Sequence, residues 1–167
     1  TNSFTATSGN NTYTGGTGID TVIVTTGANT INVGGGTTAN SVTVGAAAGL
    51  NTVTTTSTGV DTLVISAVQT TGGYYTSLTG WAKGDKIDFT AVDATGTTEA
   101  TLGTKITLGG ASNFADYLDA ATASTGTEGE LNWFQFGGNT FVTVDAAANT
   151  TFLAGTDSVI QLAGLVD

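Results

Sequence analysis

The chain has 167 residues and carries 13 acidic residues against three lysines, which gives a net charge of −10. It contains no His, Cys or Arg, which excludes disulfides, zinc sites built from nitrogen and sulfur ligands, and Ser–His–Asp or Cys–His catalysis. Three lysines cannot neutralise many phosphates, and no run of about 18 apolar residues occurs, so we predict neither nucleic-acid binding nor membrane insertion.

A repeated turn-and-strand motif runs through about residues 7–66. Residues 15–23 read G-G-x-G-x-D-x-U-x, where U is a large apolar residue, and this nonapeptide is a known repeat of parallel β-helices. The shorter core G-x-(D/N)-x-U recurs with steps of 9, 9, 11, 11 and 10 residues between its polar positions, which are Asn11, Asp20, Asn29, Asn40, Asn51 and Asp61. The U positions, which we expect to point inward, are Tyr13, Val22, Ile31, Val42, Val53 and Leu63. Each repeat therefore predicts a tight turn followed by a short strand with Thr, Ser and Asn on its outer face.

Two repeats make one coil of such a structure, so alternate repeats share an edge. One edge then carries Asn11, Asn29 and Asn51, which we expect to form an amide hydrogen-bond ladder without metal. The other edge carries Asp20, Asn40 and Asp61. Calcium prefers six to eight oxygen ligands, several of them carboxylates. We therefore predict a Ca²⁺ site on the Asp edge, and the alternative is a second ladder without metal.

Turn carbonyl groups complete this predicted calcium site. Gly15, Thr17 and Gly18 precede Asp20 in the one complete nonapeptide, so we expect their backbone oxygens to face the ion. Further along the chain, Asp85 and Asp88 alternate with Lys83 and Lys86. These two aspartates are either members of surface ion pairs or further calcium ligands at the end of the repeats.

The composition changes near Gln69–Gly73. Residues 1–70 hold only two charged side chains, whereas residues 71–167 hold the other eleven acids, all three lysines, six of the seven phenylalanines and both tryptophans. We therefore divide the chain into a β-roll over residues 1–70 and a β-rich C-terminal cap with a conventional core over residues 71–167. The fold class that we predict is all-β: a parallel β-roll or β-helix followed by a mainly β cap with one short helix.

The cap contains five predicted strands and a helix. The helix begins after the capping residue Asn113, presents Phe114, Tyr117, Leu118 and Ala121 on one face, and ends by residues 124–126. Gly137-Gly138-Asn139 predicts a hairpin between the third and fourth strands. The strands are predicted at Lys86–Phe89, Thr104–Leu108, Leu131–Phe136, Thr140–Asp145 and Ser158–Leu162.

The repeats resemble those of the RTX family, large calcium-binding proteins that Gram-negative bacteria export by the type I pathway. Residues 83–89 (KGDKIDF) are similar to a segment that follows RTX rolls, and residues 133–145 and 155–164 resemble the C-terminal cap and secretion region of such proteins. The resemblance implies an extracellular or cell-surface location and bound Ca²⁺. Because the chain contains no methionine, we expect it to be part of a longer or processed protein, with further repeats before it.

Three functions follow as hypotheses. The first is a secreted structural module that assembles with copies of itself, as S-layer subunits and adhesins do. The second is the calcium-binding secretion domain of a protease or lipase whose catalytic part lies upstream. The third is an ice-binding repeat. The carboxylate pairs Asp116 with Asp119 and Glu128 with Glu130 are the candidates for a two-carboxylate glycosidase site, but their spacing is typical of solvated surface residues, so we predict no enzymatic activity.

Overall fold

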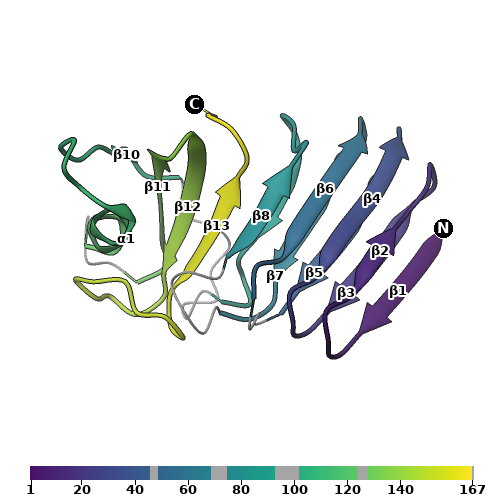
Figure 1. The fold of residues 1–167 in the computed structure, drawn as a ribbon, viewed down its shortest axis with the longest axis horizontal. Coiled ribbons are helices and arrows are strands. Elements are labelled where there is room, and N and C mark those ends of the chain that lie inside the picture. The colour runs from purple at the N-terminus through teal and green to yellow at the C-terminus, as the bar shows by residue number, and fades with distance from the viewer. Residues whose placement is uncertain (46–48, 69–74, 93–101, 124–127, 167) are drawn as a thin grey trace.

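The structure is a computed structural model, and it describes the chain except for residues 46–48, 69–74, 93–101, 124–127 and 167. It is mainly β, and parallel sheets form a β-solenoid to which a cap with one helix is joined (Figure 1). The predicted fold class is confirmed, while the boundary predicted at Gln69–Gly73 lies outside the described residues. The solenoid strands are β1 (Asn2–Ala6), β2 (Thr12–Thr14), β3 (Asp20–Val24), β4 (Thr30–Gly36), β5 (Ser41–Val44), β6 (Thr52–Ser57), β7 (Thr62–Ile65), β8 (Thr76–Thr79) and β9 (Lys86–Asp88). The cap contains β10 (Lys105–Ile106), α1 (Phe114–Thr122), β11 (Glu130–Phe136), β12 (Asn139–Asp145) and β13 (Ser158–Leu162).

Successive strands of the solenoid alternate between two sheets. The odd-numbered strands form a parallel sheet in the order β1-β3-β5-β7-β9, and β2, β4, β6 and β8 are neighbours in the second sheet. The register aligns equivalent repeat positions, since Val22 pairs with Val42 and Val42 pairs with Leu63. Each coil therefore places the same side chain at the same point of the cross-section.

The solenoid interior is a narrow apolar core between the sheets. The predicted inward residues Val22, Ile31, Val42, Val53 and Leu63 are each no more than 1% exposed, and Tyr13 is half-buried. A second inward residue follows two positions later in most strands, such as Val24, Val33, Val44 and Ile65. At roughly 1.5–3 kcal/mol for each fully buried aliphatic side chain, this stack is the main stabilising contribution to the solenoid. Strands β1 and β8 were not predicted, because neither contains the glycine-containing motif.

Glycine is required where one turn stacks on the turn before it. Gly27 has φ +93°, and a Cβ there would lie 2.2 Å from the carbonyl oxygen of Gly9. Gly9 itself has φ +82° but open space around its Cα. The turn glycines therefore serve two separate needs, a left-handed backbone and close packing between coils.

The cap continues the second solenoid sheet. Strand β13 pairs in parallel with β8, and β12, β11 and β10 follow, so this sheet has eight strands. The predicted strand Ser158–Leu162 and the hairpin between β11 and β12 are confirmed, whereas β10 is shorter than the predicted Thr104–Leu108. The strand predicted in the cap at Lys86–Phe89 is β9, which instead pairs with β7 in the first solenoid sheet. Helix α1 begins at the predicted cap, because the Asn113 side chain accepts hydrogen bonds from the backbone of Ala115 and Asp116.

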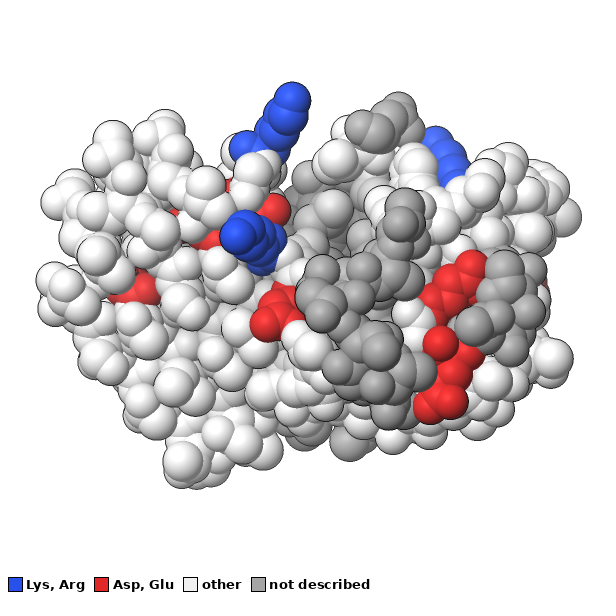
Figure 2. Space-filling model, turned by 180° about the vertical axis from the view of Figure 1, so that it is seen from behind, with Lys and Arg blue, Asp and Glu red and all other residues white. Residues whose placement is uncertain are grey.

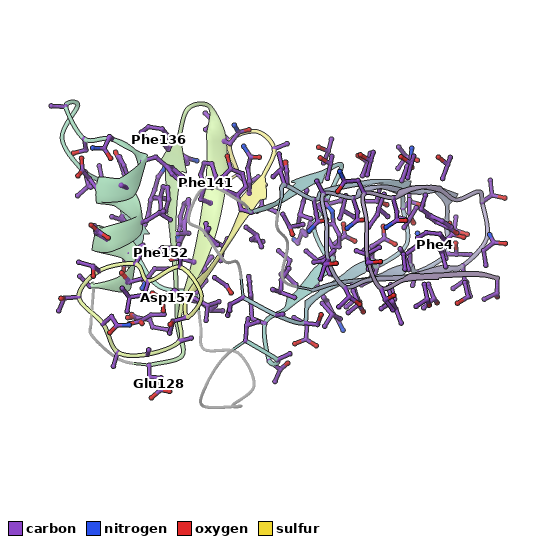
Figure 3. All side chains as sticks on the ribbon, turned by 60° about the horizontal axis from the view of Figure 1, so that its bottom comes forward. Phe4, Glu128, Phe136, Phe141, Phe152 and Asp157 are labelled. Atoms are coloured by element: carbon purple, nitrogen blue, oxygen red, sulfur yellow. The ribbon has the colours of Figure 1, made fainter. Side chains whose placement is uncertain are left out.

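Aromatic side chains join α1 to the cap sheet. Phe114 and Tyr117 of the helix lie within 6 Å, centroid to centroid, of Phe134, Phe136 or Phe141 on β11 and β12. Phe134 is completely buried in this second core. Figure 3 shows its neighbours Phe136 and Phe141 on the cap sheet beside the helix.

Candidate functional site

The Asn edge is a hydrogen-bonded ladder, as predicted. The Asn29 Oδ1 atom accepts hydrogen bonds from the Asn11 backbone N–H at 3.0 Å and from the Asn11 Nδ2 at 2.9 Å. Asn29 repeats both donations to the Asn51 Oδ1, each at 2.9 Å. The remaining Nδ2 proton of Asn29 points to the turn carbonyls of Thr26 and Gly27. The side chains of Asn11 and Asn29 therefore each close their own turn and bond to the adjacent coil.

The Asp edge forms a second column, in which side-chain oxygens again accept hydrogen bonds from the adjacent coil. The Asp20 N–H donates to the Asn40 Oδ1 at 3.0 Å, and the Asn40 N–H and Nδ2 donate to the Asp61 Oδ1 at 2.8 and 2.9 Å. The column continues to Asp85, whose Oδ1 accepts from the Asp61 N–H at 2.9 Å. The register predicted for Asp20, Asn40 and Asp61 is thus correct. These three side chains lie inside the solenoid, each no more than 3% exposed.

The other predicted calcium ligands lie at different distances from this column. Gly15 adjoins Asp20, since a Cβ on Gly15 would lie 1.9 Å from the Asp20 Oδ2. The Thr17 carbonyl oxygen accepts a long hydrogen bond from the Thr38 hydroxyl at 3.5 Å, and Gly18 is half-buried in the same turn. Asp88 is outside the column, and its Oδ1 accepts a hydrogen bond from the Thr90 N–H at 2.9 Å.

The column fits a bound calcium ion poorly. The coil of Asn40 lies between those of Asp20 and Asp61 and is hydrogen-bonded to both, so the two carboxylates are two coils apart, with their backbones roughly 10 Å apart at about 4.8 Å per coil. The Asp61 carboxylate already accepts hydrogen bonds from Asn40 and from the Thr55 hydroxyl, and both Asp85 oxygens also accept backbone donors. Within the described residues, no group of three acidic side chains is close enough to hold a metal ion. Calcium binding by this edge therefore remains a prediction, and its contacts are those of a ladder.

Asp20 is the exception within the column. Its Oδ1 accepts hydrogen bonds from the Asn2 Nδ2 at 2.7 Å and from the Tyr13 hydroxyl at 3.0 Å, whereas its buried Oδ2 has no partner. Burial and the hydrogen bond to Asp20 raise the pKa of Tyr13 above its ordinary value of 10.0. The tyrosine therefore stays protonated as a donor to this carboxylate.

The outer face of the second sheet carries hydroxyl groups in two rows. The strand register places Thr12, Thr30, Thr52 and Ser77 in one row and Thr14, Asn32, Thr54 and Thr79 in the other. The first sheet is less uniform, because Ile23, Val64, Lys86 and Asp88 interrupt its rows of Thr and Ser. The solenoid end of the molecule shows few charged atoms, as seen on the left of Figure 2.

The first acidic pair considered for glycoside hydrolysis, Asp116 with Asp119, has structural partners. Asp116 caps α1 by accepting from the Asn113 N–H at 2.7 Å, and Asp119 accepts from the Phe152 N–H at 2.9 Å. Glu128 is exposed. The described surface also has a mostly apolar hollow of about 430 Å³ beside Trp81, with one lysine and one aspartate, Lys83 and Asp85, in its wall.

The cap also contains a pair of buried carboxylates that was not predicted from the sequence, Asp145 and Asp157. They bracket the connection between β12 and β13, and each is at most 1% exposed. The available signal was an aspartate at each end of a loop between two apolar strands.

No family model matches the chain, and a search of curated proteins found no match. Among the described residues, no helix has the length and apolar character needed to cross a membrane.

Proposed function

We propose that the chain is a non-enzymatic structural module that acts outside the bacterial cell, binds calcium and assembles with copies of itself. The observation that carries this proposal is the end of the solenoid at β1 and β2, called the open end because each of these strands has one neighbour among the described residues of the 167-residue chain. Repeats of the same kind can continue the solenoid there, either from an earlier part of a longer protein or from a second copy. Strand β9 is likewise the last strand of the first sheet, whereas β8 pairs with β13 of the cap. Unpaired strand edges readily pair with another chain.

The open end combines hydrogen-bonding and apolar groups. The Asn2 N–H donates to the Ile19 carbonyl, and the Ala6 carbonyl accepts from Thr25, so these residues face β3. By the alternation of a parallel ladder, Ser3 and Thr5 direct their backbone groups away from β3, toward a partner. Phe4 and Tyr13, with ring centroids 5.3 Å apart, cover the core at this end and are only partly buried.

In the 167-residue chain, a second copy can pair with this end by symmetry. A two-fold axis between two open ends would pair β1 with β1 and β2 with β2 as antiparallel strands, which is an isologous contact. The extracellular location rests on the resemblance to RTX proteins, and the lack of catalytic function is supported by the absence of His, Cys and Arg.

Replacing one edge residue tests the assembly. Thr5→Pro removes an outward N–H without breaking a bond to β3, and Thr5→Val keeps that N–H as the matched control. Light scattering with millimolar calcium should show oligomers for the parent chain and for Thr5→Val, and association at least about tenfold weaker for Thr5→Pro, a change equivalent to about 1.4 kcal/mol. A parent chain that stays monomeric at high concentration would overturn the proposal, as would equal association of the two variants.

A second candidate function is ice binding, which the two hydroxyl rows favour. Threonine has few χ1 states, and the rows repeat at about 4.8 Å across strands and about 6.7 Å along them, so they can hold surface water in a regular array. Thr52→Tyr would interrupt a row, and Thr62→Tyr on the other sheet is its control. Thermal hysteresis that only Thr52→Tyr removes would support this function, and no hysteresis in the parent chain would eliminate it.

A further inference from the structure

The loop that joins β12 to β13 contains two buried carboxylates. Val144 pairs with Ser158 across these antiparallel strands. Asp145 and Asp157 are the next residues along the two strands, at the point where the strands separate into the loop. The Ala146 N–H donates to the Asp157 Oδ1 at 3.0 Å, which ties the two sides together. Figure 3 shows Asp157 in this loop, beyond the end of the cap sheet.

The two carboxylates differ in the number of hydrogen bonds that their oxygens accept. The Asp157 Oδ2 accepts from the Leu153 N–H at 2.7 Å, so each of its oxygens has a backbone donor. The Asp145 Oδ1 accepts from the Ala147 N–H at 3.3 Å, but its Oδ2 has no partner although Asp145 is only 1% exposed. A buried carboxylate oxygen without a donor or a cation is costly.

The lysines have contacts with other groups. Lys105 contacts Gln135 and the Trp133 ring, and Lys83 and Lys86 are exposed near β9. Burial and the negative charge of Asp145 raise the pKa of Asp157 above 3.8, against the effect of its two backbone donors. Two like charges in a buried site favour either a shared proton or a cation.

Asn149, in the same loop, has an unpaired buried atom as Asp145 does. The Asn149 Nδ2 is buried and has no acceptor. A half-turn of an amide exchanges its nitrogen with its oxygen, which would offer an oxygen ligand to a cation and remove the unpaired donor. The loop therefore offers carboxylate and amide oxygens but no nitrogen or sulfur ligand.

We propose that the loop from Asp145 to Asp157 binds a calcium ion, with Asp145 and Asp157 as its charged ligands and the Asn149 amide and backbone carbonyls as neutral ones. Calcium accepts irregular sets of six to eight oxygens, including water, whereas magnesium requires a near-octahedral set. The ion would fix the end of β12 to the start of β13, and through β13 the junction with β8. This site deepens the calcium-binding part of the proposed function, and it does not depend on self-assembly.

Calorimetric titration of the full 167-residue chain with CaCl₂, after removal of divalent ions, tests the site. Asp145→Asn should weaken calcium binding about tenfold or more, because affinity follows the number of charged ligands. Glu128→Gln removes an exposed carboxylate from the adjoining segment and should leave binding unchanged. Asp20→Asn should also retain the site, since Asp20 lies in the solenoid.

Melting temperatures of the calcium-free proteins distinguish a lost calcium site from a folding defect. Asp145→Asn should melt at the same temperature as the parent chain or higher without calcium, and should lose the rise in Tm that calcium gives the parent. Equal calcium affinity of the parent and Asp145→Asn would overturn the site, as would a parent chain that binds no calcium at millimolar concentration. Light scattering on the same samples reports assembly separately, so loss of the site and loss of the proposed function are distinguishable.

Discussion

Truncation of Asn29 measures how much the amide ladder contributes to the solenoid. Asn29→Ala removes both hydrogen bonds from Asn11 to the Asn29 Oδ1 and the Nδ2 bond to the Asn51 Oδ1. It also removes the Nδ2 bonds to the turn carbonyls of Thr26 and Gly27. At about 1 kcal/mol for each intramolecular hydrogen bond, the three ladder bonds alone contribute about 3 kcal/mol to the free energy of unfolding. The side chain is 2% exposed, so water reaches the vacated positions poorly.

Asn11→Ala is the matched control, because it removes the same chemical group at a half-buried position. It deletes one ladder bond and two turn bonds that are equivalent to those of Asn29, so the ladder contribution that it removes is about 1 kcal/mol, about 2 kcal/mol less than in Asn29→Ala. Urea unfolding followed by circular dichroism, with constant calcium, gives both values. Equal losses in the two variants would refute the view that burial makes the ladder stabilising.

Three further predictions use other parts of the structure. Gly27→Ala should destabilise the chain more than Gly9→Ala in thermal melts, because both residues have positive φ but only a Cβ at residue 27 meets the backbone of another coil; equal melting temperatures would contradict this. Phe134→Ala should lower the free energy of unfolding by about 3–5 kcal/mol in urea titrations, since Phe134 is completely buried among aromatic rings. Because the folded-state pKa of Asp157 is raised, its contribution to stability without calcium is fully present below pH 3.8 and is lost as pH rises through the folded-state pKa. Calcium-free Asp157→Asn should lack this pH-dependent component, and an unchanged pH profile would show that Asp157 does not cause it.

The repeats made the solenoid predictable, because one motif specifies a turn, a strand and an inward residue together. Val22, Val42 and Leu63 could be assigned to the core from spacing alone, and they are buried as expected. β8 could not be found in this way, since its Leu78 enters the core without a preceding glycine turn of the repeat type. Its place depends on pairing with β6 and β13, which are distant in sequence.

The direction of polar side chains was the harder part of the site. The motif placed Asp20 and Asp61 on one edge correctly, but it gave no sign that both carboxylates turn inward and accept hydrogen bonds from the adjacent coil. Asp145 and Asp157 have no repeat to mark them. Their proximity follows only from the antiparallel pairing of β12 with β13.

The parallel junction between β8 and β13 has a consequence for the order of folding. The β11–β12 hairpin joins strands that are adjacent in sequence, so its loop closure has a small entropic cost and we expect it to form early. Once β13 is added, the cap presents an edge on which β8 can pair, and β6, β4 and β2 can then pair in turn. The solenoid should therefore grow from its C-terminal coil toward its N-terminal coil, with the cap as the seed and β1 and β2 as the last strands to be ordered.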